Sequence, residues 1–332
     1  MHGRVRILPF IIMGLILLLE WYAFSGFSPV IETFSDTIKL IVNSAFYGLM
    51  IVSGISLVVV FVAGNGLSKS FRNFLFAFVF INLCALVVFD LFVLIDDLRR
   101  GVYWLAQSSD LSRSVLLIST GLIVAGLPAV LFLLGMIMGP YRYKVHPTEI
   151  LLKNLPPAFD GLKIVQISDI HSGSFYNKKA VQKGVDMILD QKPDVIFFTG
   201  DLVNDDATEM DPYKAIFSQL RAPKGVFSIL GNHDYGDYVQ WPSKEAKLEN
   251  LNKLKTVHGE MGWRLLLNEH TYLEEDGERL GLIGVENWGK GFHQVGDLSK
   301  AYEGCEADVK LLLSHDPTHW DEQVKKDYTD ID

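Results

Sequence analysis

The chain has 332 residues, enough for about two domains, and 49% of them are hydrophobic, with a mean hydropathy of +0.23. Residues 1–140 hold eight of the 30 Lys/Arg and seven of the 39 Asp/Glu, so the remainder holds 22 basic and 32 acidic residues. This acidic remainder argues against nucleic acid as a routine partner, because phosphate backbones need basic surface. The two cysteines, Cys84 and Cys305, exclude a disulfide framework.

The first 140 residues predict a domain of four transmembrane helices. Crossing a bilayer takes about 20 apolar residues in a helix, and four stretches qualify, at about 7–24, 40–63, 74–95 and 115–138. The first follows Arg4 and Arg6, as in a signal peptide, but it has no convincing cleavage site and three more spans follow it. We therefore expect a retained anchor in an integral membrane protein, with the lipid bilayer as its partner.

The distribution of Lys and Arg predicts the orientation of these spans. A cytoplasmic N-terminus places six basic residues inside, namely Arg4, Arg6, Lys69, Arg72, Arg142 and Lys144. It places four outside, Lys39, Arg99, Arg100 and Arg113, three of which share their loop with Asp96, Asp97 and Asp110. The bias favours a cytoplasmic second half.

Two acidic residues, Glu20 and Asp90, lie inside apolar runs. Acids within a membrane can mark ion or proton pathways. We instead expect both to sit near a span end and to reach the headgroups, because the spans contain no second acid or base that would make a relay.

From about residue 141 the composition changes from apolar to mixed, which predicts a linker with one short strand (149–152) over 141–160 and a second domain over 161–332. Apolar runs there alternate with helical stretches, as in α/β folds. Asp276-Gly277 predicts a hairpin or meander. We expect strands at 162–168, 194–199, 225–230, 264–267, 271–275, 280–285 and 309–314, and helices at 177–191, 211–220 and 243–261.

Four of the expected strands end in residues that can ligate a metal. In chain order these are Asp169 and His171, Asp201, Asn232 and His233, and His315. Ligands of open α/β sheets bind at the carboxyl ends of strands, so we expect the four ends to form one rim. Strand alternation is expected to place Asp169 and His171 on one face.

These residue types suit a two-metal site that hydrolyses a phosphate ester. Two cations about 3.5–4 Å apart can supply a nucleophile, neutralise charge and help the leaving oxygen. Holding them so close requires a shared anionic ligand, which the carboxylate of Asp201 can supply. Mixed oxygen and imidazole ligands suit Mn, Fe, Zn or Ni, and an unligated histidine can serve as acid or hydrogen-bond donor.

The motifs Asp169-Ile-His171, Gly200-Asp201, Gly231-Asn-His-Asp234 and His315 resemble those of the calcineurin-like metallophosphoesterases, and the hydrophobic N-terminal part resembles membrane-associated bacterial members. The resemblance implies a β-sandwich flanked by helices, at a bacterial inner membrane, that hydrolyses phosphomonoester, phosphodiester or pyrophosphate bonds with two divalent metal ions. It implies roles for seven residues: Asp169 and His171 ligate the first metal, Asp201 bridges both, Asn232 and His315 ligate the second, His233 is the catalytic, non-ligating histidine, and Asp234 orients His233.

The family pattern ends with Gly-His-x-His on a further strand, and this motif is absent from the sequence. We therefore expect the domain to be C-terminally incomplete, lacking one ligand for each metal. One interpretation is an enzyme whose gene continues past Asp332. The alternatives are a catalytically impaired membrane protein whose domain serves binding or regulation, and a transporter whose functional part is the membrane half.

The connection from the fourth span to Leu162 is only about 20 residues long. A site held at a membrane meets lipid-linked phosphates at a high effective concentration, which favours a lipid or envelope-precursor phosphate as substrate over soluble nucleotides. We expect Asp205 and Asp206 to form a solvated loop. We expect the other histidines to be structural or surface residues, namely His146, His258, His270, His293 and His319.

Overall fold

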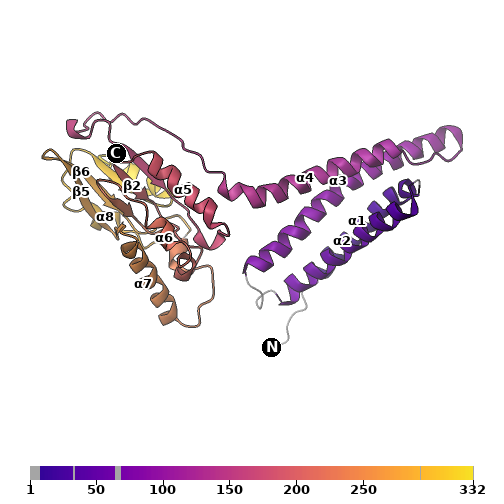
Figure 1. Cartoon of the computed structure of the whole chain (residues 1–332), viewed down its shortest axis with the longest axis horizontal. Helices are drawn as coiled ribbons and strands as arrows, with labels where there is room; N and C mark the ends of the chain where they lie inside the picture. The colour runs from indigo at the N-terminus through magenta and orange to yellow at the C-terminus, as the bar shows by residue number, and fades with distance from the viewer. Residues whose placement is uncertain (1–7, 33, 64–68, 292, 332) are drawn as a thin grey trace. The chain divides into compact units, whose positions relative to one another are not determined.

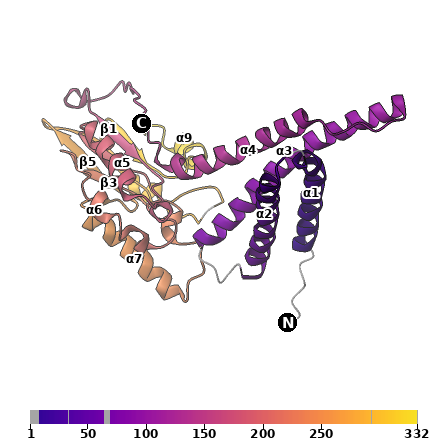
Figure 2. The same cartoon turned by 45° about the vertical axis from the view of Figure 1, so that its right-hand side comes forward.

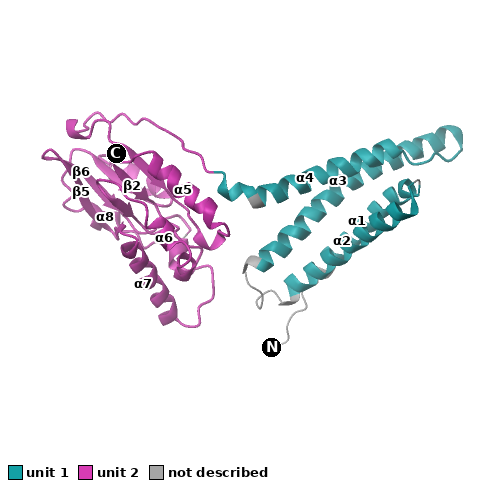
Figure 3. Ribbon diagram, in the orientation of Figure 1, with its two compact units in different colours: residues 1–142 teal, residues 143–332 magenta. Residues whose placement is uncertain are grey.

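The computed structural model describes residues 8–32, 34–63, 69–291 and 293–331 of the chain. They form two compact units, Met1–Arg142 and Tyr143–Asp332, which are coloured separately in Figure 3. Four long helices come first, and an α/β unit follows (Figure 1). The expected fold class, a helical membrane bundle followed by an α/β domain, is confirmed.

The first unit consists of the helices α1 (Leu8–Ile31), α2 (Asp36–Ala63), α3 (Lys69–Gln107) and α4 (Val115–Met138). All four are long and apolar enough to cross a membrane. α3 packs against each of the other three, and Phe27, Phe89, Val93 and Ile118 are buried in their shared core. The unit is thus a membrane-spanning helical bundle.

The helix α3 continues through acidic and basic residues that we expected in a loop. Asp96 pairs with Arg99 at 2.9 Å and Asp97 pairs with Arg100 at 3.2 Å, each one helical turn apart. Arg113 approaches the carboxylates of Asp96 and Asp97 at 3.4 Å and 2.9 Å. Because the charges pair within the α3–α4 hairpin, the segment stays helical where its composition indicated a loop.

The acids within the apolar runs do not lie as expected. Glu20 is 2% exposed and Asp90 is 7% exposed, so both are buried within the bundle rather than extended towards headgroups. Their carboxylate oxygens have no hydrogen-bond partner among the residues that the structure describes. Arg4 and Arg6, which contribute to the predicted orientation, lie outside the described residues.

The second unit contains two sheets. The first is parallel throughout, in the order β1 (Ile164–Ile167), β2 (Val195–Phe198), β3 (Val226–Ser228), β4 (Arg264–Leu265). In the second, β6 (Glu278–Gly284) pairs antiparallel with β5 (Glu269–Glu275) and parallel with β7 (Lys310–Leu313). The β5–β6 pair confirms the hairpin at Asp276-Gly277, whose residues both have positive φ.

The two sheets enclose one hydrophobic core. Phe197 and Phe227 from the first sheet share a buried cluster with Leu282 and Leu313 from the second. Because side chains alternate along a strand, Phe198 faces the other way and packs on Trp263, with ring centroids 5.3 Å apart. The arrangement is the expected β-sandwich with helices outside it.

Helices cover the outside of the second unit, and Figures 1 and 2 show the longest of them, α7 (Lys244–Glu260), from two sides. Asn177 and Ser243 cap α5 (Lys178–Asp190) and α7 by accepting backbone N–H groups. The expected helix over 211–220 is shorter, as α6 (Lys214–Phe217). Two further short helices are α8 (Leu298–Tyr302) and α9 (Lys325–Asp327).

The prediction of a strand at 149–152 is wrong. This segment is irregular, and its apolar residues Ile150 and Leu151 are 72% and 86% exposed. An apolar run forms a strand only where a neighbouring strand takes up its backbone groups, and the first sheet begins at β1 instead.

His258 on α7 is a buried structural histidine, as expected. It is fully buried, its Nδ1 lies 3.0 Å from Ser228 Oγ on β3, and its ring lies 5.9 Å from that of Trp263. Burial disfavours the charged imidazolium and lowers the pKa of His258 to about 3. The unfolded chain, in which this pKa returns to about 6.5, therefore takes up a proton that the folded unit excludes.

We predict that His258 makes the second unit unstable in acid. Between about pH 6.5 and pH 3 the unfolded state binds the extra proton, so the free energy of unfolding falls as the pH falls, by up to about 1.4 kcal/mol per pH unit. In His258→Gln this contribution disappears. Chemical unfolding of the full chain in detergent, followed by tryptophan fluorescence at pH 4.5–7.5, measures both slopes. The exposed His146→Gln is the control, and equal slopes in His258→Gln and wild type would contradict the prediction.

Candidate metal centre

The loops that follow β1 and β2 carry three of the expected ligands on unusual backbone. Asp169, His171 and Asp201 have φ values of 54°, 46° and 62°, in the left-handed region that non-glycine residues rarely adopt. The N–H groups of Asp169 and His171 donate to the carbonyls of Gly200 and Asp201, both at 3.0 Å. β1 ends at Ile167, so these turns and not strand alternation direct Asp169 and His171 to the same place.

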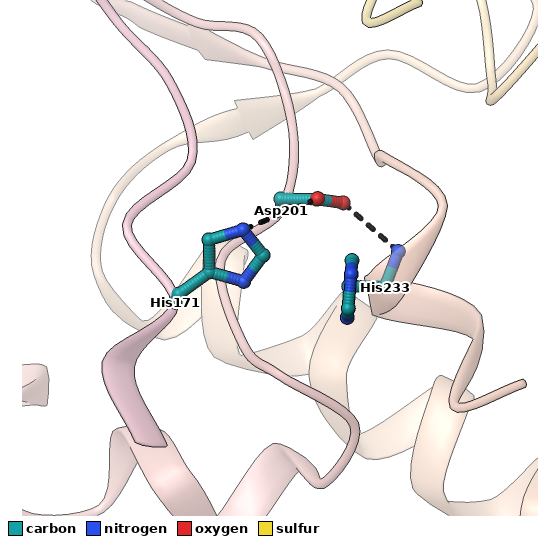
Figure 4. A group of neighbouring side chains, drawn as sticks. All are labelled: His171, Asp201 and His233. Atoms are coloured by element: carbon teal, nitrogen blue, oxygen red, sulfur yellow. Dashed lines mark hydrogen bonds and ion pairs between the residues drawn. The ribbon is translucent and has the colours of Figure 1, made fainter. Parts of the chain in front are cut away.

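The carboxylate of Asp201 lies at the middle of the site, and its side chain is only 3% exposed. Its Oδ2 is 3.5 Å from His171 Nε2 and 3.4 Å from His315 Nε2. Its Oδ1 accepts a hydrogen bond of 2.9 Å from the backbone N–H of His233. Figure 4 shows Asp201 between His171 and His233.

His315 and Asn232 complete one side of the site. His315 Nδ1 donates to the carbonyl of Thr199 at 2.8 Å, which leaves Nε2 directed at Asp201 and at Asn232 Oδ1, 3.1 Å away. Asn232 Nδ2 donates to the hydroxyl of Tyr238 at 2.7 Å. His315 follows β7 of the second sheet, so the strand ends that carry the expected ligands belong to both sheets.

The electrostatics of this side favour a positive charge. Burial opposes ionisation of Asp201, but the hydrogen bond and charge of His315 outweigh it and hold the pKa of Asp201 below its ordinary value. Burial likewise opposes the charging of His315, yet its contact with Asp201 raises the pKa of His315 to about 9. The negative charge of Asp201 thus stabilises a positive charge on the imidazole beside it.

Two groups of ligand atoms gather around Asp201 in the described part of the chain. Atoms of His171, Asp201 and His233 lie within 4.8 Å of one another, and so do atoms of Asp169, Asp201 and His315. Carboxylate oxygens and imidazole nitrogens at this spacing suit first-row divalent metals. The donor set therefore fits metal ions, and Asp201 belongs to both groups.

His233 lies in the short 3-10 helix η6 (His233–Tyr235). Its Nδ1 donates to the carbonyl of Asn204 at 2.8 Å, so Nε2 remains available to the site. Its ring meets that of His171 edge to face, with centroids 4.7 Å apart (Figure 4). From this position Nε2 can bind a metal or transfer a proton.

Asp234, which we expected to orient His233, has a different task. It is fully buried, and its carboxylate accepts backbone N–H bonds from Gly231 and Asp201 at 2.9 Å and from Leu202 and Val203 at 2.8 and 3.3 Å. The carbonyl of Asn204 is the partner of the His233 ring instead. Asp234 thus holds the backbone that carries Asp201.

Two glycines allow this close approach. A Cβ at Gly231 would meet Asp201 Oδ1 and would lie 2.8 Å from His315 Cε1, while Gly200 has a φ of +101°. The glycines that directly precede Asp201 and Asn232 are therefore required by the packing of the two loops.

Sequence reasoning missed the partners that orient the ligands. The carbonyls of Thr199 and Asn204 carry no signal, because every residue has a carbonyl. Asp205, expected in a solvated loop, is buried at 3% exposure. The sequence offered one indication of the role of Tyr238, namely that it is an aromatic residue only a few positions after the motif Gly231-Asn-His-Asp234.

Comparison with known proteins identifies the family. Residues 162–331 match the family model described as calcineurin-like phosphoesterase, and residues 4–140 match that of the probable calcineurin-like phosphoesterase transmembrane domain. The chain belongs to the calcineurin-like phosphoesterases, a family of hydrolases that act on phosphate esters.

Similar proteins occur in animals and bacteria. The chain is 32% identical over 195 residues to a transmembrane protein with metallophosphoesterase domain from Bos taurus, covering 57% of this chain and 42% of the relative. It is 36% identical over 100 residues to the uncharacterized metallophosphoesterase YkuE of Bacillus subtilis (29% and 35%). It is 41% identical over 90 residues to the UDP-2,3-diacylglucosamine pyrophosphatase LpxG of Chlamydia trachomatis (26% and 27%). The chain spans less than half the length of each of these relatives.

Proposed function

We propose that the protein is a membrane-anchored, metal-dependent phosphoesterase with a two-metal site. The observation that carries the proposal is the buried carboxylate of Asp201, with the imidazole nitrogens of His171 and His315 at 3.5 and 3.4 Å. The family of the second unit (143–332), below called the catalytic unit, supports the same chemistry.

The proposed ligands are Asp169 and His171 for one ion and Asn232 and His315 for the other, with Asp201 shared. When bound, such divalent ions would neutralise phosphoryl charge and acidify a water molecule. The chain holds each imidazole by its far nitrogen or by its backbone, so the ligand atoms are directed before an ion arrives.

His233 is proposed to act on the substrate and not as a ligand. With Nδ1 donating to Asn204, a protonated Nε2 can donate to a phosphoryl or leaving oxygen. The grouping of His233 with His171 and Asp201 makes a ligand role the competing assignment.

One pair of variants distinguishes these roles. Asp201→Asn retains an acceptor for the His233 N–H but loses the shared charge, so we expect it to lose most of both metal ions. His233→Ala should retain the metals and lose turnover by about 100-fold or more. Elemental analysis and hydrolysis of bis(p-nitrophenyl) phosphate by the full chain in detergent, with exposed His146→Ala as control, measure both. Full occupancy in Asp201→Asn would exclude the bridging role, and metal loss parallel to activity loss in His233→Ala would make His233 a ligand.

We also propose that the catalytic unit faces the cytoplasm. Arg142 and Lys144 directly follow the last span, as expected for a cytoplasmic end. Protease should therefore degrade the catalytic unit in sealed inverted vesicles and spare it in right-side-out vesicles. The reverse pattern would refute the orientation.

For the substrate, we propose a lipid-linked phosphodiester or pyrophosphate. α4 ends at Met138 and β1 begins at Ile164, so a short connection keeps the site from diffusing away from the bilayer. This raises its effective concentration towards lipid-borne substrates. The similarity to LpxG, named for a diacylated sugar nucleotide, supports the same class.

Competition in detergent micelles tests this substrate class. We expect the full chain to hydrolyse a phospholipid-like diester in preference to a soluble nucleotide diester at equal total concentration. Raising the micelle concentration should dilute the lipid substrate at the micelle surface and reduce its rate, while the nucleotide rate stays constant. A preference for the nucleotide at every micelle concentration would exclude the lipid class and favour soluble nucleotides.

A further inference from the structure

Tyr238 lies outside the ligand motifs in the sequence, but its side chain contacts two of the proposed functional residues. Its hydroxyl accepts the hydrogen bond from Asn232 Nδ2 at 2.7 Å. Its ring stacks on the imidazole of His233, with centroids 4.3 Å apart and planes inclined by 27°. A single side chain thus contacts a proposed ligand of the metal centre and its proposed acid.

We propose that Tyr238 is a positioning residue that fixes the amide of Asn232 and the ring of His233 for metal binding and turnover. The inference rests on the proposed function, in which Asn232 is a ligand and His233 is the acid. It adds a residue to which neither the motifs nor the metal-ligand groups assign a role.

The contact with Asn232 sets the plane of a weak ligand. An amide oxygen carries no net charge, so a small misalignment costs a large part of its affinity for a cation. With Nδ2 bonded to Tyr238, Asn232 Oδ1 is presented at 3.1 Å from His315 Nε2, on the side of the metal centre. Groups that orient a ligand in this way commonly contribute 10–100-fold to metal affinity.

The stacking contact restricts the second residue. The ring of His233 is already held at Nδ1 by the carbonyl of Asn204. A hydrogen bond at one atom still permits the ring to rock about that atom, and an aromatic face 4.3 Å away limits the motion. The two contacts together direct Nε2 into the site.

Tyr238 is itself held by its loop. Its backbone N–H donates to Asp205 Oδ1 at 3.2 Å. Trp241 Nε1 donates to the carbonyl of Gly236 at 2.7 Å, and Asp237 pairs with Lys247 on α7. A residue positioned by its surroundings can position others without a large loss of its own entropy.

Tyr238 is not a buried residue of the hydrophobic core. Tyr238 is 46% exposed and lines a cavity of about 250 Å³ together with Asn232, Asn287 and His293. Replacing a half-exposed ring on a loop should affect stability little. The effects of substitution can therefore be measured on folded protein.

Two substitutions separate the two contacts. Tyr238→Phe removes the hydroxyl but keeps the stacked ring, so we expect Mn²⁺ affinity to fall about 10-fold while turnover at saturating Mn²⁺ stays within about 3-fold of wild type. Tyr238→Leu removes both contacts and should also lower turnover at saturating Mn²⁺ by about 10-fold. The matched control is Tyr272→Phe on β5, whose hydroxyl also accepts a hydrogen bond, from the backbone N–H of Glu306 at 3.0 Å, and whose ring also contacts a histidine, His270.

Mn²⁺ binding to the full chain in detergent is measured by electron paramagnetic resonance, and turnover is measured with bis(p-nitrophenyl) phosphate. Wild-type Mn²⁺ affinity in Tyr238→Phe would overturn the role at Asn232. Equal turnover in Tyr238→Phe and Tyr238→Leu would overturn the role at His233. If the wild-type chain binds no Mn²⁺, the proposed function fails and this inference fails with it. If wild type binds and turns over but both Tyr238 variants match it, only the inference fails.

Discussion

The candidate metal centre depends on the buried carboxylate of Asp234, which binds no metal in our assignment. Asp234 accepts four backbone N–H groups, one from Gly231 and three from residues 201–203. Each of these buried donors would otherwise be unsatisfied, at a cost of about 1–3 kcal/mol. The bonds join the loop after β3 to the loop after β2, and they hold Asp201 at a φ of 62°. The position of the central carboxylate thus follows from the hydrogen bonds that its neighbour Asp234 accepts.

Around this fixed point the chain orients three further residues of the site, His315, His233 and Asn232, each by a second contact. Backbone carbonyls of Thr199 and Asn204 take the Nδ1 hydrogens of His315 and His233, and Tyr238 takes the amide hydrogen of Asn232. In each case one side-chain atom is left facing the site. These orienting partners belong to the folded loops, so the folded chain directs the three side chains by its own contacts.

Much of this could be read from the sequence, because the polar motifs follow short apolar strands. The strands before Asp169, Asp201 and Asn232 and the hairpin at Asp276-Gly277 were predictable for this reason. The pairing of β7 with β6 was not, since a parallel pair is set by contacts distant in sequence. The role of Asp234 was not predictable either. Its neighbour His233 suggested a side-chain partner, whereas its carboxylate acts on backbone groups that no motif encodes.

The buried carboxylates of Asp96 and Asp201 have partners of different kinds, and the difference bears on why the candidate metal-ligand groups of the described residues gather around Asp201. Asp96 and Asp97 in α3 form ion pairs with guanidinium groups at 2.9–3.4 Å. Their charge is therefore neutralised at every ordinary pH, and the pairs stabilise the α3–α4 hairpin. The partners that the described residues offer to Asp201 are imidazoles and backbone N–H groups. An imidazole, even that of His315 with its pKa raised to about 9, can release its proton when a metal ion binds, whereas a guanidinium cannot. A carboxylate that faces histidines is therefore left open to a cation, and a carboxylate that faces arginines is not.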